Sequence, residues 1–315
     1  MVRSLSLALS LLPLLTVAGC SLENGYLTDI REQNFTEIFD IAGAETDIVF
    51  FADNSSSMQR ELVKLSQTFE SFLTHINDAN PRWRIITVTG DDGCSTSGVL
   101  AQDTPNVIDL FGQGIQTSPQ DTSSDEWGLF MVRQAVLKSA PGLCNEGFMR
   151  PNANLHVVFL SDEPDTSPGW EAGGRYWQDY VTAITVAKGD AEKVRFSAIV
   201  GPSNGSCQDA EPGLGYIDAV NASGGEVLSI CSDWTDDIEI LADASIQQDT
   251  FPLQHEPFVE TIGIRVNSED RLEGWTYDLD SNSVIITEDI PSGRDEVVVS
   301  YRGYLTVEVE AGADE

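Results

Sequence analysis

Basic residues are scarce in this sequence. It has 17 Lys and Arg against 51 Asp and Glu, which gives a formal net charge of -34. A protein that binds nucleic acid neutralises phosphates with lysine and arginine, so this imbalance excludes nucleic acid as a partner.

Two sequence motifs of common enzymes are also missing. It has no phosphate-binding glycine loop with its lysine and no H-E-x-x-H pair. The three histidines, His75, His156 and His255, have no cysteine or aspartate beside them at a spacing that suits zinc, so we expect structural roles for them. The sequence therefore predicts a protein that is not an enzyme.

The apolar run near the amino end is too short to cross a membrane. It covers residues 4–18, about 15 residues, whereas a spanning helix needs about 20. The run ends in Val17, Ala18, Gly19 and Cys20, which resembles the lipobox of bacterial lipoproteins. We therefore expect residues 1–19 to be a signal peptide, Cys20 to carry the lipid, and residues 20–44 to form a polar, lipidated tether.

The predicted location is the bacterial cell envelope, with a lipid anchor. Ser21 stands where a lipoprotein of the inner membrane carries aspartate, which favours the outer membrane. An ordinary secretory signal with an incidental cysteine is the alternative.

The other four cysteines are Cys94, Cys144, Cys207 and Cys231. An even number in an exported chain predicts two disulfides. We expect sequential pairing, Cys94 with Cys144 and Cys207 with Cys231; four free thiols are the alternative.

Apolar runs alternate with amphipathic stretches between residues 45 and 246. Strands are expected at 47–52, 85–88, 155–160, 194–200 and 226–229, and helices at 58–77, 125–138, 176–188 and 234–245. This alternation predicts an α/β domain with a doubly wound, mainly parallel sheet and helices on both faces.

The pattern changes after residue 246. A linker with two prolines is expected at 247–258, followed by period-two strands at 261–266, 283–287 and 296–301. Residues 259–315 are thus predicted to form a small C-terminal all-β module.

One carboxylate and two hydroxyls follow the first strand at alternate positions. Asp53, Ser55 and Ser57 form a D-x-S-x-S arrangement in the turn that opens a helix. Taken alone, such residues could simply cap the helix amino end. A buried strand leading into this turn resembles the metal-ion-dependent adhesion site of von Willebrand factor type A (vWA) domains.

The rest of that resemblance covers about residues 45–245. In the family, a second loop brings a Thr or Ser to the metal just before a helix; Ser123 fits that spacing best, while Thr122 is the more usual residue type, so both are candidates. The family's second carboxylate ends the fourth strand, which corresponds to Asp162, and Glu163 and Asp165 would then lie at the rim. Residues 147–151 (GFMRP) and 155–165 (LHVVFLSDEPD) resemble the branch found in bacterial surface lipoproteins.

The resemblance implies a divalent cation held by Asp53, Ser55, Ser57, Thr122 or Ser123, and Asp162. Hydroxyl and carboxylate oxygens suit Mg²⁺, and Mn²⁺ or Ca²⁺ would also fit. It also implies that the ion binds a protein or other ligand that supplies a carboxylate, in adhesion or envelope assembly. A metal-assisted hydrolase with Glu163 as its base, and a structural envelope protein with a purely structural ion, are the alternatives.

Overall fold

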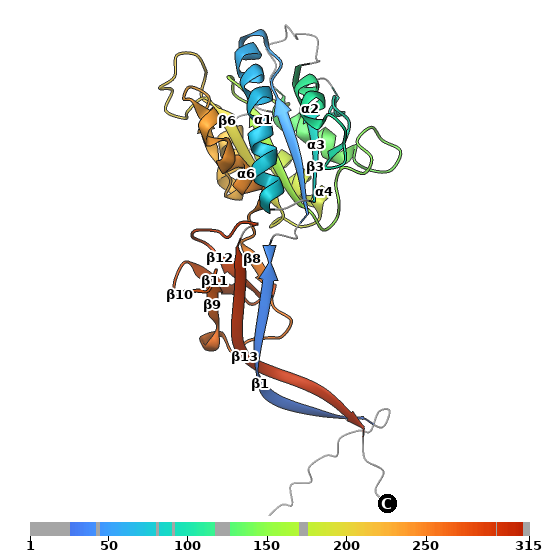
Figure 1. Cartoon of the computed structure of the whole chain (residues 1–315), viewed down its shortest axis with the longest axis vertical. Coiled ribbons are helices and arrows are strands. Elements are labelled where there is room, and N and C mark those ends of the chain that lie inside the picture. The colour runs from blue at the N-terminus through green and yellow to red at the C-terminus, as the bar shows by residue number, and fades with distance from the viewer. Residues whose placement is uncertain are drawn as a thin grey trace, which may run out of the picture.

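The structure, a computed structural model, describes residues 26–41, 45–79, 82–89, 92–116, 127–169, 176–293 and 295–310. The predicted signal peptide, the lipidation site Cys20 and the two candidate ligands Thr122 and Ser123 lie outside these residues. The described chain forms two parts, a head (residues 45–246) and a β module (residues 26–41 and 250–310), with the two-stranded end of the module projecting away from the head (Figure 1).

The head is built on a six-stranded sheet in the order β4-β3-β2-β5-β6-β7. All neighbouring strands are parallel except β4, which runs antiparallel to β3. Counted along the head, this is the order 3-2-1-4-5-6, so the predicted doubly wound α/β fold is confirmed. The strands are β2 (Thr46–Ala52), β3 (Trp83–Val88), β4 (Leu100–Ala101), β5 (Asn154–Leu160), β6 (Val194–Val200) and β7 (Val227–Ser229).

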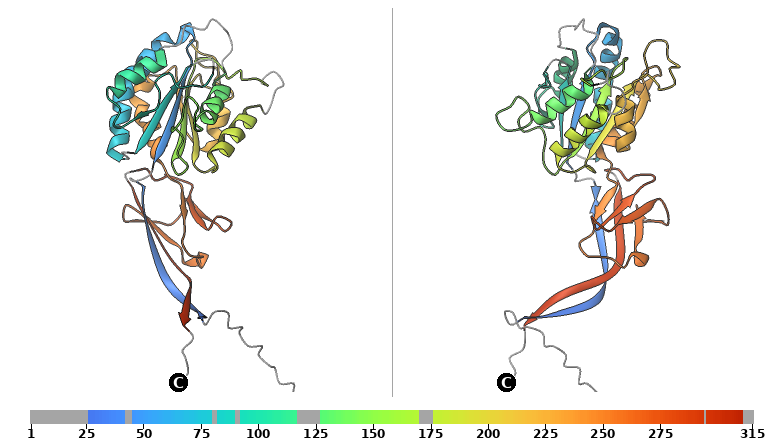
Figure 2. Two further views of the ribbon diagram at one scale, coloured as in Figure 1. Left: turned by 90° about the vertical axis from the view of Figure 1, so that its right-hand side faces the viewer. Right: turned by 180° about the vertical axis from the view of Figure 1, so that it is seen from behind.

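Helices cover both faces of the sheet (Figure 2). α1, α2 and α6 enclose one core, in which Phe50, Phe69 and Phe111 stack edge or face against one another. α3, α4 and α5 enclose the other core. The helices are α1 (Gln59–Ala79), α2 (Val107–Gln116), α3 (Gly128–Leu137), α4 (Tyr176–Lys188), α5 (Tyr216–Ser223) and α6 (Ile238–Ile246). Single 3-10 turns are η2 (Ser56–Met58) and η4 (Trp234–Asp237) in the head, and η5 (Val259–Thr261) in the module.

Helices α2 and α5 were not expected from the sequence. Two glycines, Gly112 and Gly114, lower the helix propensity of α2. Both are needed for close packing, because a Cβ atom at Gly112 would lie 2.4 Å from Ser66 Oγ and one at Gly114 2.4 Å from Thr87 Oγ1. Contacts with other elements, not local propensity, therefore determine α2.

The β module contains two antiparallel sheets, β1-β13-β9-β10 and β11-β12-β8, as the period-two pattern predicts. Its strands are β1 (Tyr26–Asp40), β8 (Thr250–Pro252), β9 (Gly263–Val266), β10 (Glu269–Arg271), β11 (Trp275–Asp278), β12 (Ser283–Ile286) and β13 (Glu296–Glu310). A separate core of Phe251, Val284, Val299 and their neighbours lies between the sheets.

Strand β1 replaces most of the expected polar tether. It pairs along its whole length with β13, from Tyr26 opposite Glu310 to Asp40 opposite Glu296. The sequence of β1 looks polar because only one face of the strand is covered. This happens in the half that ends at Asp40, where Phe35 and Phe39 pack against the module core. One buried face supplies too few apolar residues for the sequence pattern to stand out from a linker.

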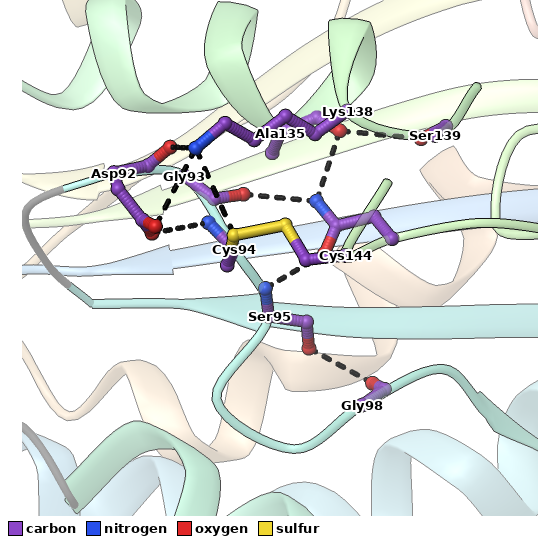
Figure 3. Close-up of a disulfide and its surroundings, with 10 residues drawn as sticks. Asp92, Gly93, Cys94, Ser95, Gly98, Ala135, Lys138, Ser139 and Cys144 are labelled. Carbon is purple, nitrogen blue, oxygen red and sulfur yellow. Dashed lines mark hydrogen bonds and ion pairs between the residues drawn. A yellow bond between two sulfur atoms is a disulfide. The ribbon is translucent and has the colours of Figure 1, made fainter. Parts of the chain in front are cut away.

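Both disulfides have the predicted sequential pairing. Cys94–Cys144 joins the loop after β3 to the loop after α3 (Figure 3). The buried Asn145 amide donates to the Gly93 and Ala135 carbonyls, and its side-chain oxygen accepts from Ser95 N. The bridge therefore lies in a well-bonded junction.

A buried ion pair lies at the amino ends of the parallel strands of the head sheet, on the side nearest the module. The fully buried Asp47 accepts hydrogen bonds from Arg150 N at 2.6 Å and Arg150 Nε at 2.8 Å. Burial raises the pKa of Asp47, and the Arg150 bonds and charge only partly offset this. In the described part of the chain, no helix is both long and apolar enough to cross a membrane.

Candidate metal site at the carboxyl edge of the head sheet

The site begins in the turn after β2. Asp53 is 1% exposed, and its Oδ1 accepts a hydrogen bond from Ser55 N at 2.7 Å. The hydroxyls of Ser55 and Ser57 lie 3.0 Å apart, so both point to the same side of the turn. The Ser55 side chain makes no cap hydrogen bond to η2. The turn thus gathers one carboxylate and two hydroxyls, as the spacing predicted.

The end of β5 brings a second carboxylate to this turn. Asp53 N donates to Leu160 O at 2.9 Å, which holds the two strand ends together. The Ser57 hydroxyl lies close enough to the Asp162 carboxylate to lower its pKa. One oxygen of this carboxylate, Asp162 Oδ1, is buried and has no hydrogen-bond partner among the described residues. Asp53, Ser55, Ser57 and Asp162 therefore meet at one point.

Negative charge is concentrated at this point. Burial raises the pKa of Asp162, the Ser57 hydrogen bond lowers it, and the charges of Asp53 and Glu61 raise it further. Burial also raises the pKa of Glu163, followed by the charges of Asp53, Asp162 and Glu211. Two carboxylates that share a site repel each other, and a cation between them would relieve this repulsion.

The donor atoms fit a hard divalent cation. Two carboxylates and two hydroxyls supply only oxygen, which is the ligand type of Mg²⁺ and Ca²⁺. Among the described residues no three His, Cys, Asp or Glu side chains are grouped closely enough to hold a metal ion. That finding is compatible with this set, because half of its donors are serine hydroxyls.

Ser161 was not singled out from the sequence as a functional residue. It is fully buried, and its hydroxyl donates to Asp53 Oδ2 at 2.9 Å. With Ser55 N on Oδ1, both oxygens of the Asp53 carboxylate are held in place. The only signal in the sequence was a serine directly before Asp162, and that position alone does not reveal a bond to a residue more than 100 positions away.

Asp165 does not lie at the rim, contrary to our expectation. It is 2% exposed, and its Oδ1 accepts hydrogen bonds from Leu129 N and the Ser167 hydroxyl, both at 2.9 Å. Burial raises its pKa to about 6, although these bonds act in the opposite direction. Asp165 therefore caps the first turn of α3, which is the helix that follows the undescribed Thr122 and Ser123. Glu163 is half-buried beside Asp162.

No known family profile and no curated protein matches the chain. Similar solved structures include a von Willebrand factor type A protein from Catenulispora acidiphila, with 10% identity and a TM-score of 0.43 over 89% of this chain and 65% of that one. Proximal thread matrix protein 1 from the mussel byssus, with a zinc-occupied MIDAS motif, has 16% identity and a TM-score of 0.38 over 66% of this chain and 48% of that one. The open form of the SpaC pilus adhesin from Lactobacillus rhamnosus GG has 10% identity and a TM-score of 0.39 over 88% and 42%. The chain thus spans less than two thirds of the length of each.

The six strands of the head follow the order 3-2-1-4-5-6, and only the third strand, β4, runs antiparallel to its neighbour. The head has a vWA-like fold. In this fold the first and fourth strands of the head, β2 and β5, flank the point where the strand order reverses, and ligands of doubly wound sheets bind beyond that point. Asp53 and Asp162 follow those two strands.

Proposed function

We propose that the carboxyl edge of the vWA-like head binds a divalent cation, with Mg²⁺ the expected ion, and through it a carboxylate of a partner protein or another acidic ligand. The observation that carries this proposal is Asp162 Oδ1, a buried carboxylate oxygen with no hydrogen-bond partner among the described residues. Leaving such a group unpaired costs about 1–3 kcal/mol or more. A cation beside Asp53, Ser55 and Ser57 would give it a partner.

The choice of ligands favours binding of a further acid. The two aspartates compensate the charge of the ion, whereas the hydroxyls of Ser55 and Ser57 add none. A hard cation with neutral oxygen ligands stays electrophilic and keeps exchangeable waters. A carboxylate from another molecule can replace one of these waters.

We favour binding over catalysis. A metal-assisted hydrolase needs a base near the ion and a pocket for its substrate. Glu163 is the candidate base, and its pKa, raised by burial and by three neighbouring carboxylates, would suit that role, so the place of the pockets decides between the two functions. The cavities of 850 and 480 Å³ lie in the β module and at its junction with the head.

We further propose that the protein is an envelope lipoprotein anchored through Cys20, with the outer membrane as its expected location. Strand β1 begins at Tyr26, shortly after Cys20, and the β1/β13 ribbon leads from there to the module (Figure 1). Fifteen residues of strand correspond to about 50 Å along the chain. Such an anchor would hold the carboxyl edge of the head far from the membrane. Incorporation of labelled palmitate into the wild type but not into Cys20→Ser tests this proposal.

Calorimetric titration of Mg²⁺ and Mn²⁺ into the metal-stripped protein tests the cation site. We expect saturable binding by the wild type, loss of binding in Asp53→Ala, and at least about tenfold weaker binding in the isosteric Asp162→Asn. Asp103→Ala is the matched control. This exposed aspartate follows β4, which runs antiparallel to β3, so it lies at the amino ends of the parallel strands and away from the site. Its substitution should leave binding unchanged. A wild type that binds neither ion would refute the site. Partner binding that survives chelation would instead support a purely structural ion.

A further inference from the structure

A long loop between β6 and α5 borders the candidate metal site. Glu211 N donates to Asp162 O at 2.8 Å, and Asp165 N donates to Leu214 O at 2.9 Å. Residues 211–214 therefore run alongside residues 162–165, directly beside the second carboxylate of the site. We call residues 211–214 the rim segment.

The rim segment is fixed in place. A Cβ atom at Gly201 would lie 1.9 Å from Glu211 O, and one at Gly213 would lie 2.5 Å from Val200 Cβ, so the loop lies tightly against the end of β6. The Cys207–Cys231 disulfide ties the same loop to the segment after β7. Only glycine permits such close approach, and a fixed backbone can select between partners without first being ordered.

The rim segment presents two different side chains to solvent. Leu214 is 54% exposed, although leucine is among the residue types most often buried. Glu211 is exposed as well, and it lies close enough to Glu163 for its charge to act on that carboxylate. The rim segment therefore combines an exposed apolar side chain with a carboxylate that acts on Glu163.

We propose that the rim segment selects the partner. The carboxylate that binds the cation belongs to a protein segment with two further features: a basic side chain that faces Glu211 and Glu163, and an apolar side chain that faces Leu214. This inference rests on the proposed cation-dependent function and specifies its partner. Like charges placed opposite each other across an interface are strongly disfavoured, so a uniformly acidic segment is excluded even though the ion itself attracts acids.

The test is selection from a displayed library of random short peptides on the Mg²⁺-loaded protein, with elution by a chelator. Peptides eluted from the wild type should contain Asp or Glu flanked by Lys or Arg and by an apolar residue. Glu211→Lys should reverse the charge of the preferred flanking residue, and Leu214→Ser should remove the apolar preference. Glu260→Lys changes the net charge equally on the exposed surface of the module and should select as the wild type does.

Synthetic peptides that differ only in the flanking residue give the magnitude. We expect the lysine form to bind the wild type about tenfold more tightly than the glutamate form, and this order to reverse in Glu211→Lys. If no peptide is eluted by the chelator, the cation-dependent function fails and this inference with it. If acidic peptides are eluted but their flanking residues are the same for the wild type and Glu211→Lys, the cation site stands and the role of the rim segment is refuted.

Discussion

The buried histidine His156 should make the head less stable as the pH falls. It is 1% exposed in the middle of β5, and its ring nitrogens lie 2.6 Å from the Ser245 hydroxyl of α6 and 2.8 Å from the Ser197 hydroxyl of β6. Burial, together with the charge of Arg195, lowers its pKa from 6.5 to about 3. The folded protein therefore holds the neutral ring at pH values where the unfolded chain takes up a proton.

The sign and size of the effect follow from this difference in pKa. As the pH falls below 6.5, proton uptake stabilises only the unfolded state, so the free energy of unfolding decreases by about 1.4 kcal/mol per pH unit. Between about pH 8 and about pH 5 the loss is about 2 kcal/mol. Asp165 acts in the opposite direction, because its pKa is raised from 3.8 to about 6 and the folded state takes up the proton first.

Because the two groups oppose each other, the pH dependence of the wild type alone cannot separate them. Denaturant unfolding of the wild type, His156→Gln and Asp165→Asn at about pH 8 and about pH 5 separates their contributions. Far-ultraviolet circular dichroism reports on the head, since the described α-helices all lie there.

His156→Gln should be less stable than the wild type at the higher pH and should recover about 2 kcal/mol relative to it at the lower pH. For Asp165→Asn the gap should change in the other direction, by about 1.4 kcal/mol. A gap between the wild type and His156→Gln that is equal at both pH values would refute the reasoning.

Two further predictions concern the stability of the head, measured by the same unfolding experiment. Replacing Cys94 and Cys144 by serine should lower the free energy of unfolding by about 4 kcal/mol, and replacing Cys207 and Cys231 by about 3.5 kcal/mol, because the larger loop loses more entropy when it is closed in the unfolded chain; equal losses would contradict this order. Arg150→Met leaves Asp47 buried without the guanidinium that balances its charge, which should cost about 3–5 kcal/mol, while Asp47→Asn/Arg150→Met should cost less; a double variant as unstable as the single one would show that the charge of Asp47 is not the cause.

The sequence predicted the central strands well because burial on both faces leaves continuous apolar runs. All seven residues of β2 are buried, and so are all seven of β6. The D-x-S-x-S turn was predictable for a related reason, since its position after a buried strand is a local feature. The meeting of this turn with Asp162 depended on the family resemblance, because it joins residues more than 100 positions apart.

Features decided by distant contacts were missed. Strand β1 is defined by its pairing with β13, and the rim segment is defined by the hydrogen bonds from Glu211 N to Asp162 O and from Asp165 N to Leu214 O. Asp165 was placed at the rim because an acid in a loop after a strand is usually exposed. Its burial depends on Leu129 N at the start of α3, a donor that the sequence gives no reason to pair with it.

The helix that leads from the head to the β module is tied to α1 at one end and to the sheet at the other. Before α6, Trp234 Nε1 donates to Glu61 Oε2 at 2.9 Å, and Glu61 lies in the first turn of α1, just after the Ser57 turn. Near the end of α6, the Ser245 hydroxyl lies 2.6 Å from His156 Nδ1 in β5. Strand β8 then begins at Thr250. Because α6 is held at both points, its position against α1 and β5 is fixed just before the chain enters the module.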